Sequence, residues 1–240
     1  MQTQSIDLPG KRLLRPVYDN RAFKLPWRIF LILLPVVVVV IAPGALLLAS
    51  NLFGALVAFN VMSTINRERE QGTYDLLAMT PSGLGASNWL IAAAWTQRIG
   101  AVERLATMRT LAIILLALLL IYSLSSEAIT PVVVLALLVG LNLDAIQSLI
   151  VGCLSGMLAQ QFSGSGSPFA ALAIFAFAQV IAVYLPATGA AIFAYDLLRS
   201  LGWERWQVES AAALVGVLLL FALHELVIRV MWRQLERRLL

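Results

Sequence analysis

Long apolar runs separated by short polar segments dominate the sequence. Three stretches, 29–66, 110–126 and 145–195, contain no charged residue. A helix that crosses the hydrocarbon core of a bilayer needs about 20 apolar residues. The first and the third stretch are each long enough for two such crossings. The pattern therefore predicts an all-α integral membrane protein.

The breaks between the apolar runs predict six transmembrane helices, because proline and glycine-rich segments commonly mark helix ends. The first pair of spans could instead be a re-entrant hairpin, since each half is short, and both arrangements return the chain to the same side. The breaks are Pro43-Gly44, Pro131, the segment 163–168 (SGSGSP) and Pro186. The predicted spans are 28–43, 45–64, 108–126, 131–158, 168–187 and 209–231.

Composition and charge agree with a membrane protein and indicate its orientation. The chain is 60% hydrophobic and 12% charged, whereas about a quarter of the residues in a soluble domain are charged. All but two of the 17 Lys and Arg residues fall in or beside 1–28, 65–107 and 232–240, and the exceptions are Arg199 and Arg205. Cytoplasmic loops carry most basic residues. We therefore expect a multi-pass protein of the plasma (inner) membrane with both termini in the cytoplasm.

The net charge of +4 is explained by the cytoplasmic face of such a bundle, where anionic lipid attracts basic residues. Lipid is thus an expected partner. Nucleic acid is not expected, because its binding needs a basic patch on a folded soluble module. The resulting division of the chain is a basic cytoplasmic or interfacial segment (1–27), a six-helix membrane domain (28–232) and a basic cytoplasmic tail (233–240).

The polar segment 65–107 between the second and third spans contains two short helical patterns. Its first part reads INREREQGTYDLLAMTPS (65–82). Gly72 breaks a polar helical turn, Thr73 can cap a new short helix, and Pro81 stops that helix. Such a surface helix suits docking onto a cytoplasmic partner, and a solvated loop is the plainer alternative.

The second part, 83–107, has apolar residues at helical spacing with charged residues between them. This pattern predicts an interfacial amphipathic helix, or else a cytoplasmic extension of the third span. The apolar positions are Trp89, Ile91, Trp95, Ile99 and Val102.

The order of residues in 65–82 resembles the cytoplasmic coupling segment of permease subunits of ATP-binding-cassette exporters of the type 2 class. The resemblance implies a six-span half-transporter that pairs with a second copy or a related permease chain. It also implies separate ATP-binding subunits, which would carry ATP and Mg, while this chain itself would hold no cofactor. The positions that match the coupling pattern are Glu68, Arg69, Glu70, Gly72, Thr73, Leu76, Leu77, Thr80 and Pro81.

Several polar residues are expected inside the membrane. Asp144 lies midway along the fourth span with Gln147 nearby, and His224 and Glu225 lie in the sixth. A carboxylate at this depth is costly and often functional. Asp144 is therefore a candidate substrate or proton site, and the alternative is a structural Asp that is hydrogen-bonded at a helix interface. A pairing of Asp144 with His224 is compatible with the sequence, but no pattern requires it.

Small residues on the same span predict close helix packing. Ser148, Gly152 and Gly156 recur every four residues, a spacing that lets two helix backbones approach each other.

No enzymatic chemistry is expected. The nucleotide-binding pattern G-x-x-x-x-G-K-[ST] is missing from the sequence, and the acidic residues are scattered. One cysteine and one histidine are too few for a metal cluster. The alternative to a transporter is a permease-like structural or accessory subunit of a larger respiratory or photosynthetic membrane complex. The sequence names neither a substrate nor a direction of transport.

Overall fold

The computed structural model describes residues 42–74, 83–98, 116–121, 130–160 and 167–239, together with a few single or paired positions between 100 and 114. All elements in these ranges are helical. The predicted first span (28–43) lies almost entirely outside the described residues, and the third (108–126) is described only in part. The count of six spans therefore stays a prediction.

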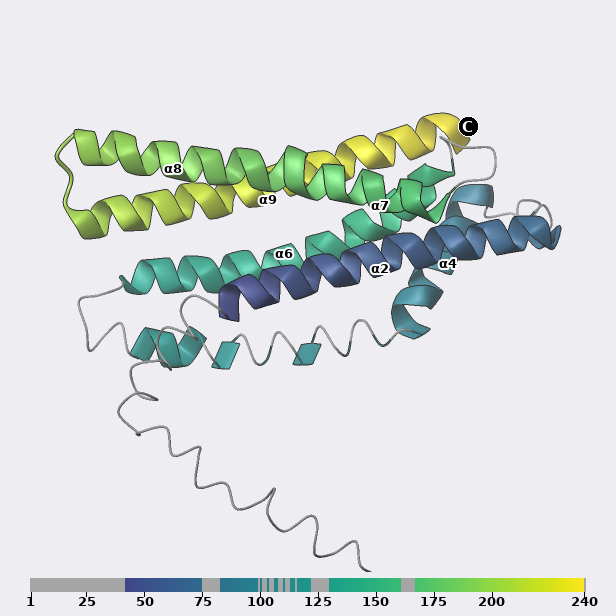
Figure 1. Ribbon diagram of the computed structural model, residues 1–240, viewed down its shortest axis with the longest axis horizontal. Coiled ribbons are helices and arrows are strands. Elements are labelled where there is room, and N and C mark those ends of the chain that lie inside the picture. The colour runs from purple at the N-terminus through teal and green to yellow at the C-terminus, as the bar shows by residue number, and fades with distance from the viewer. Residues whose placement is uncertain are drawn as a thin grey trace, which may run out of the picture.

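The described helices form a bundle of long, roughly parallel rods (Figure 1). Four helical stretches are long and apolar enough to cross a membrane, which makes the chain an all-helical membrane protein with four candidate spans. The elements are α2 (Ala42–Glu70), α4 (Gly83–Arg98), α6 (Pro131–Ala159), α7 (Pro168–Ala176), the π-helix η4 (Phe177–Tyr184), α8 (Leu185–Ser200) and α9 (Arg205–Leu239). The candidate spans are Leu47–Glu70, Pro131–Ala159, Pro168–Ser200 and Arg205–Arg237.

The predicted end of the fifth span at 187 is wrong. Helices α7, η4 and α8 follow one another without a gap, and the rod continues through Pro186 to Ser200. A proline lacks an N–H group, and its ring crowds the carbonyl four residues earlier in an α-helix. Here the turn before Pro186 is already widened, because the N–H of Leu185 donates to the carbonyl of Val180, five residues back. The π-helix thus accommodates the proline that was expected to end the span.

Helices α2 and α9 extend beyond the predicted ends of their spans, because the polar residues that follow the apolar runs continue the helix instead of ending it. Helix α2 continues past residue 64 to Glu70. Helix α9 has 35 residues, or about 50 Å at 1.5 Å per residue, against a hydrocarbon core of about 30 Å. Both helices therefore extend beyond the apolar part of the bundle.

The bundle has two distinct ends. At one, called here the α4 end, lie α4, the C-terminal ends of α2 and α6, and the end of α9 (Figure 1). At the other, the hairpin end, α8 turns into α9 through Gly202, which has a φ of 80°. Helices α2, α6 and α9 run toward the α4 end, and the α7–η4–α8 rod runs back.

The described residues between α2 and α6 lie at both ends of the bundle. Trp95 of α4 donates a hydrogen bond to Thr64 near the end of α2. Leu116 and Leu119 pack with Val134 near the start of α6, at the hairpin end. Leu116 and Leu119 belong to the part of the sequence where the third span is predicted.

Helix α4 packs on the bundle through buried small and polar residues, together with the partly buried Ile91 and Trp95. Ser87, Asn88 and Ala92 are buried, whereas Trp89 is 42% exposed. The helix ends at Arg98, and Gly100 follows with a φ of 61°. The segment 83–107 is therefore not one continuous helix.

Helices α2 and α6 touch through their backbones near the α4 end. A Cβ atom on Gly152 would lie 2.3 Å from the carbonyl oxygen of Gly54, and one on Gly156 would lie 2.8 Å from Cβ of Val61. Residues 151–159 of α6 are all buried. The small residues of α6 therefore lie at the closest helix contact in the core.

Candidate functional site: a buried polar network

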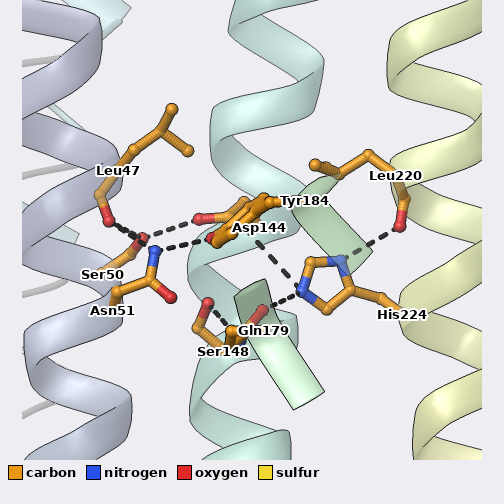
Figure 2. A network of polar contacts seen from close by, with 9 residues as sticks. All are labelled: Leu47, Ser50, Asn51, Asp144, Ser148, Gln179, Tyr184, Leu220 and His224. Carbon is orange, nitrogen blue, oxygen red and sulfur yellow. Dashed lines mark hydrogen bonds and ion pairs between the residues drawn. The ribbon is translucent and has the colours of Figure 1, made fainter. Parts of the chain in front are cut away.

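A network of polar side chains joins four elements near the middle of the bundle (Figure 2). Its centre is Asp144 of α6, which is fully buried. The hydroxyl of Ser50 in α2 lies 2.7 Å from Oδ2 of Asp144 and donates to it. The hydroxyl of Tyr184 in η4 donates to Oδ1 at 2.6 Å. Each carboxylate oxygen thus has a donor from a different element.

His224 of α9 completes the network from the other side. Its ring is fully buried, with Nδ1 3.0 Å from the carbonyl oxygen of Leu220 and Nε2 2.8 Å from Oε1 of Gln179. Carbonyl oxygens only accept hydrogen bonds. Nδ1–H therefore donates to the carbonyl of Leu220, while Nε2 faces the side-chain amide of Gln179, which carries both a donor and an acceptor. Oδ1 of Asp144 lies 3.9 Å from Nε2 of His224, so the two side chains form an ion pair when the ring is protonated.

The π-helix brings two of these residues to the same side. Gln179 and Tyr184 are five residues apart, and in a π-helix hydrogen bonds link residues at this spacing. The amide of Gln179 donates to Oγ of Ser148 at 3.0 Å. The hydroxyl of Tyr184 accepts from Nδ2 of Asn51 at 2.6 Å. The network is therefore continuous from α2 through α6 and η4 to α9.

An apolar cavity of about 220 Å³ lies next to the network on its hairpin side. Gly140 and Leu220 in its wall are each one helical turn from Asp144 and His224. Neither Asp144 nor His224 lines the cavity, so its surface is apolar apart from Thr188. The lining residues are Leu47, Leu137, Gly140, Leu141, Ala187, Thr188, Ala191, Gly216, Val217 and Leu220.

A second polar cluster lies at the α4 end. The hydroxyl of Tyr74 lies 3.1 Å from Oδ1 of Asn88 and 3.2 Å from Oε1 of Gln160. The guanidinium of Arg69 donates to the same oxygen of Gln160 at 3.3 Å and lies 4.8 Å from the centre of the Tyr74 ring. This cluster connects the chain after α2 to α4 and to the end of α6.

The structure brings together some of the polar residues expected inside the membrane and separates others. Asp144 and His224 share the network, and Ser148 belongs to it as well. Gln147 is buried outside it, and its Oε1 has no hydrogen-bond partner. Glu225 accepts from Nε of Arg229 at 2.8 Å on the surface of α9, so it points away from Asp144.

Sequence reasoning did not identify Ser50, Asn51 and Tyr184 as network members. The adjacent polar pair Ser50-Asn51 in an apolar run was the available signal. Tyr184 carried no such signal, because a tyrosine near a predicted span end is typical of the membrane interface.

The coupling pattern is described only in its first half. Gly72 has a φ of 70° and follows the end of α2 at Glu70. The hydroxyl of Thr73 donates back to the carbonyl of Glu68 at 3.1 Å and contacts its carboxylate. Thr73 thus closes the end of α2. Leu76, Leu77, Thr80 and Pro81 lie outside the described residues, and so does most of the predicted short helix.

Comparison with protein-family models, with curated proteins and with solved structures finds no match. Among the residues described, no three His, Cys, Asp or Glu side chains are grouped to hold a metal ion. The function of the chain must therefore be inferred from its own residues. It is a helical membrane protein whose helices meet at a buried polar network.

Proposed function

We propose that this chain is the membrane-spanning permease subunit of an ATP-binding-cassette exporter, which couples to a separate ATPase subunit through residues 65–82. The observation that carries the proposal is the charged end of α2. This helix leaves the apolar bundle with the matching residues Glu68, Arg69 and Glu70, and the chain turns at Gly72. Glu70 is exposed, where a docked subunit can reach it.

Mechanical continuity supports this role. Helix α2 runs without a break from Ser50 and Asn51 in the buried network to Glu70. At the α4 end, Arg69 and Tyr74 contact Gln160 next to α6. A displacement of the coupling segment would therefore move both α2 and α6, the two helices that contribute Ser50 and Asp144 to the network.

The distribution of charge supports an orientation with the α4 end in the cytoplasm of a plasma (inner) membrane. The described ends of the bundle differ in basic residues, and the basic end is expected inside. Tryptophans occur near both ends, as in aromatic belts. The α4 end carries Arg67, Arg69, Arg229, Arg233, Arg237, Trp89 and Trp232, and the hairpin end carries Arg199, Arg205, Trp203 and Trp206.

The expected partners follow from the same proposal. A half-transporter needs a second copy or a related permease chain, and large apolar side chains on α2, including Leu48, Leu52 and Leu56, are exposed. In a membrane, such surfaces face lipid or another helix. ATP and Mg would be bound by the ATPase subunit.

The proposal is tested by purifying the chain from its native membrane after gentle extraction and identifying what accompanies it by mass spectrometry. We expect a stoichiometric subunit that carries a nucleotide-binding motif. A redox or pigment complex in fixed ratio, without an ATPase, would make the chain a structural subunit instead.

Charge reversal at the coupling segment tests the docking role directly. We expect Glu70→Lys, and separately the double variant Leu76→Asp with Leu77→Asp, to abolish stimulation of the partner's ATPase in reconstituted membranes. Glu204→Lys is the matched control, because Glu204 is exposed at the opposite end of the bundle. Unchanged stimulation in both coupling variants contradicts the docking role.

A further inference from the structure

We propose that Asp144 and His224 form a proton-binding site inside the membrane domain, and that its occupancy sets the orientation of the Gln179 amide. This inference does not depend on the exporter assignment, because it rests on the buried network alone (Figure 2). The bound ligand is a proton on Nε2 of His224. The Nδ1–H group stays bonded to the carbonyl of Leu220, 3.0 Å away.

The geometry links the proton to Gln179. With the proton bound, Nε2–H donates to Oε1 of Gln179 at 2.8 Å, and the Gln179 amide donates to Ser148 at 3.0 Å. When the proton leaves for water, Nε2 keeps a lone pair that faces the lone pairs of Oε1. A half-turn of the amide removes this repulsion, because its NH₂ group then donates to Nε2. Oε1 then accepts from the hydroxyl of Ser148, which is both donor and acceptor.

The bound proton affects the packing of the helices because it determines the net charge of the buried pair. Asp144 and His224 together are neutral when both are ionised, and loss of the proton leaves the carboxylate alone. Asp144 is faced by the uncharged Ser50 from α2 and by Tyr184 from η4, and Asn51 from α2 contacts it only through the hydroxyl of Tyr184.

On α9, Glu225 and Arg229 pair with each other on the surface. Within the described part of the chain, no other charged side chain contacts Asp144 or His224. An uncompensated buried charge is strongly destabilising. Release of the proton is therefore expected to be linked to a change in how α2 and α9 pack against α6.

The chain contains a single histidine, so selective labelling reports on this site alone. We would incorporate ¹⁵N-histidine into the full chain in lipid nanodiscs and follow the two ring nitrogens by NMR between about pH 5 and pH 9. The proposal expects an imidazolium at the low end and one neutral tautomer, protonated at Nδ1, at the high end.

Three variants separate this proposal from a fixed structural pair. Asp144→Asn removes the counter-charge, and we expect the midpoint of the His224 titration to fall by about one pH unit or more. Gln179→Glu replaces the rotatable amide by a permanent acceptor, and we expect the midpoint to rise by a similar amount. Glu225→Gln is the matched control at the neighbouring position of α9, and its midpoint should equal that of the wild type.

Two results would overturn the proposal. One is a His224 ring that keeps a single protonation state across the whole pH range in the wild type, whether charged or neutral. The other is the same midpoint in Gln179→Glu and in the wild type. If Asp144→Asn does not fold, Gln179→Glu and the wild-type titration still decide the question, because both keep the carboxylate of Asp144.

Discussion

The two halves of α6 differ in how tightly they are packed. Toward the α4 end, residues 151–159 are all buried, and Gly152 lies directly against the backbone of Gly54. Toward the hairpin end, Gly140 borders the cavity of about 220 Å³. There a Cβ atom would meet only the side chain of Val217, whose two methyl groups lie at 3.1 and 3.8 Å. Asp144 lies between the two halves.

This difference indicates where the bundle can change shape. A backbone contact cannot yield without moving a whole helix, whereas a side chain can change rotamer, and a cavity has room for it. Regions with few packed contacts open at a lower free-energy cost than a close-packed core. We therefore expect the α4-end half of α6 to move with α2 as one unit. The hairpin-end half is where motion linked to the network would be accommodated.

The largest effect is expected at the border between the halves. Asp144→Ala leaves the buried hydroxyls of Ser50 and Tyr184 without their acceptor and His224 without its counter-charge. We expect the free energy of unfolding to fall by about 3 kcal/mol, measured by thermal unfolding in nanodiscs followed by tryptophan fluorescence.

The control for Asp144→Ala is Glu225→Ala, which breaks only the surface pair with Arg229. This change should cost less than about 1 kcal/mol. Equal losses in the two variants would mean that the buried network contributes no more than a surface ion pair.

The next largest effect tests the tightly packed half. Gly152→Ala puts a methyl group 2.3 Å from the carbonyl oxygen of Gly54. Helices α2 and α6 must separate to admit it, at a cost of about 2 kcal/mol. The measurement is the same unfolding curve. Gly189→Ala in α8 is the matched control, because the added carbon has no contact within 4 Å beyond the backbone of its own helix and its chain neighbours, and it should not destabilise the protein.

The smallest effect tests the loosely packed half. In Gly140→Ala the new methyl group meets only the side chain of Val217, which can turn toward the cavity. We expect a change in the free energy of unfolding below about 1 kcal/mol. A loss of unfolding free energy as large as that of Gly152→Ala would show that the two halves of α6 are equally rigid.

Much of the membrane architecture could be predicted because hydrophobicity is a local property. The runs that became α2, α6 and α9 are recognisable from composition alone, and their ends are misplaced by up to eight residues. The end of the fifth span was misjudged by more than ten residues, because a proline at a position such as Pro186 commonly ends a helix. The π-helix that carries the chain past this proline has no local signal in the sequence.

The residues of the candidate site also differ in whether the sequence alone could identify them. Asp144 and His224 stood out in the sequence, since a charged or titratable side chain in an apolar run is costly and therefore conspicuous. Their partners Ser50, Asn51 and Tyr184 did not, because each is an ordinary residue whose role depends on a neighbour more than 30 positions away.

The sequence by itself determined that this chain crosses a membrane, which of its helical runs are apolar, and which buried groups need partners. The tertiary structure decided which residues those partners are. Contact between Gly54 and Gly152 sets the register of α2 against α6 and so places Ser50 beside Asp144. Register and rotation are properties of two surfaces in contact, and neither helix determines them alone.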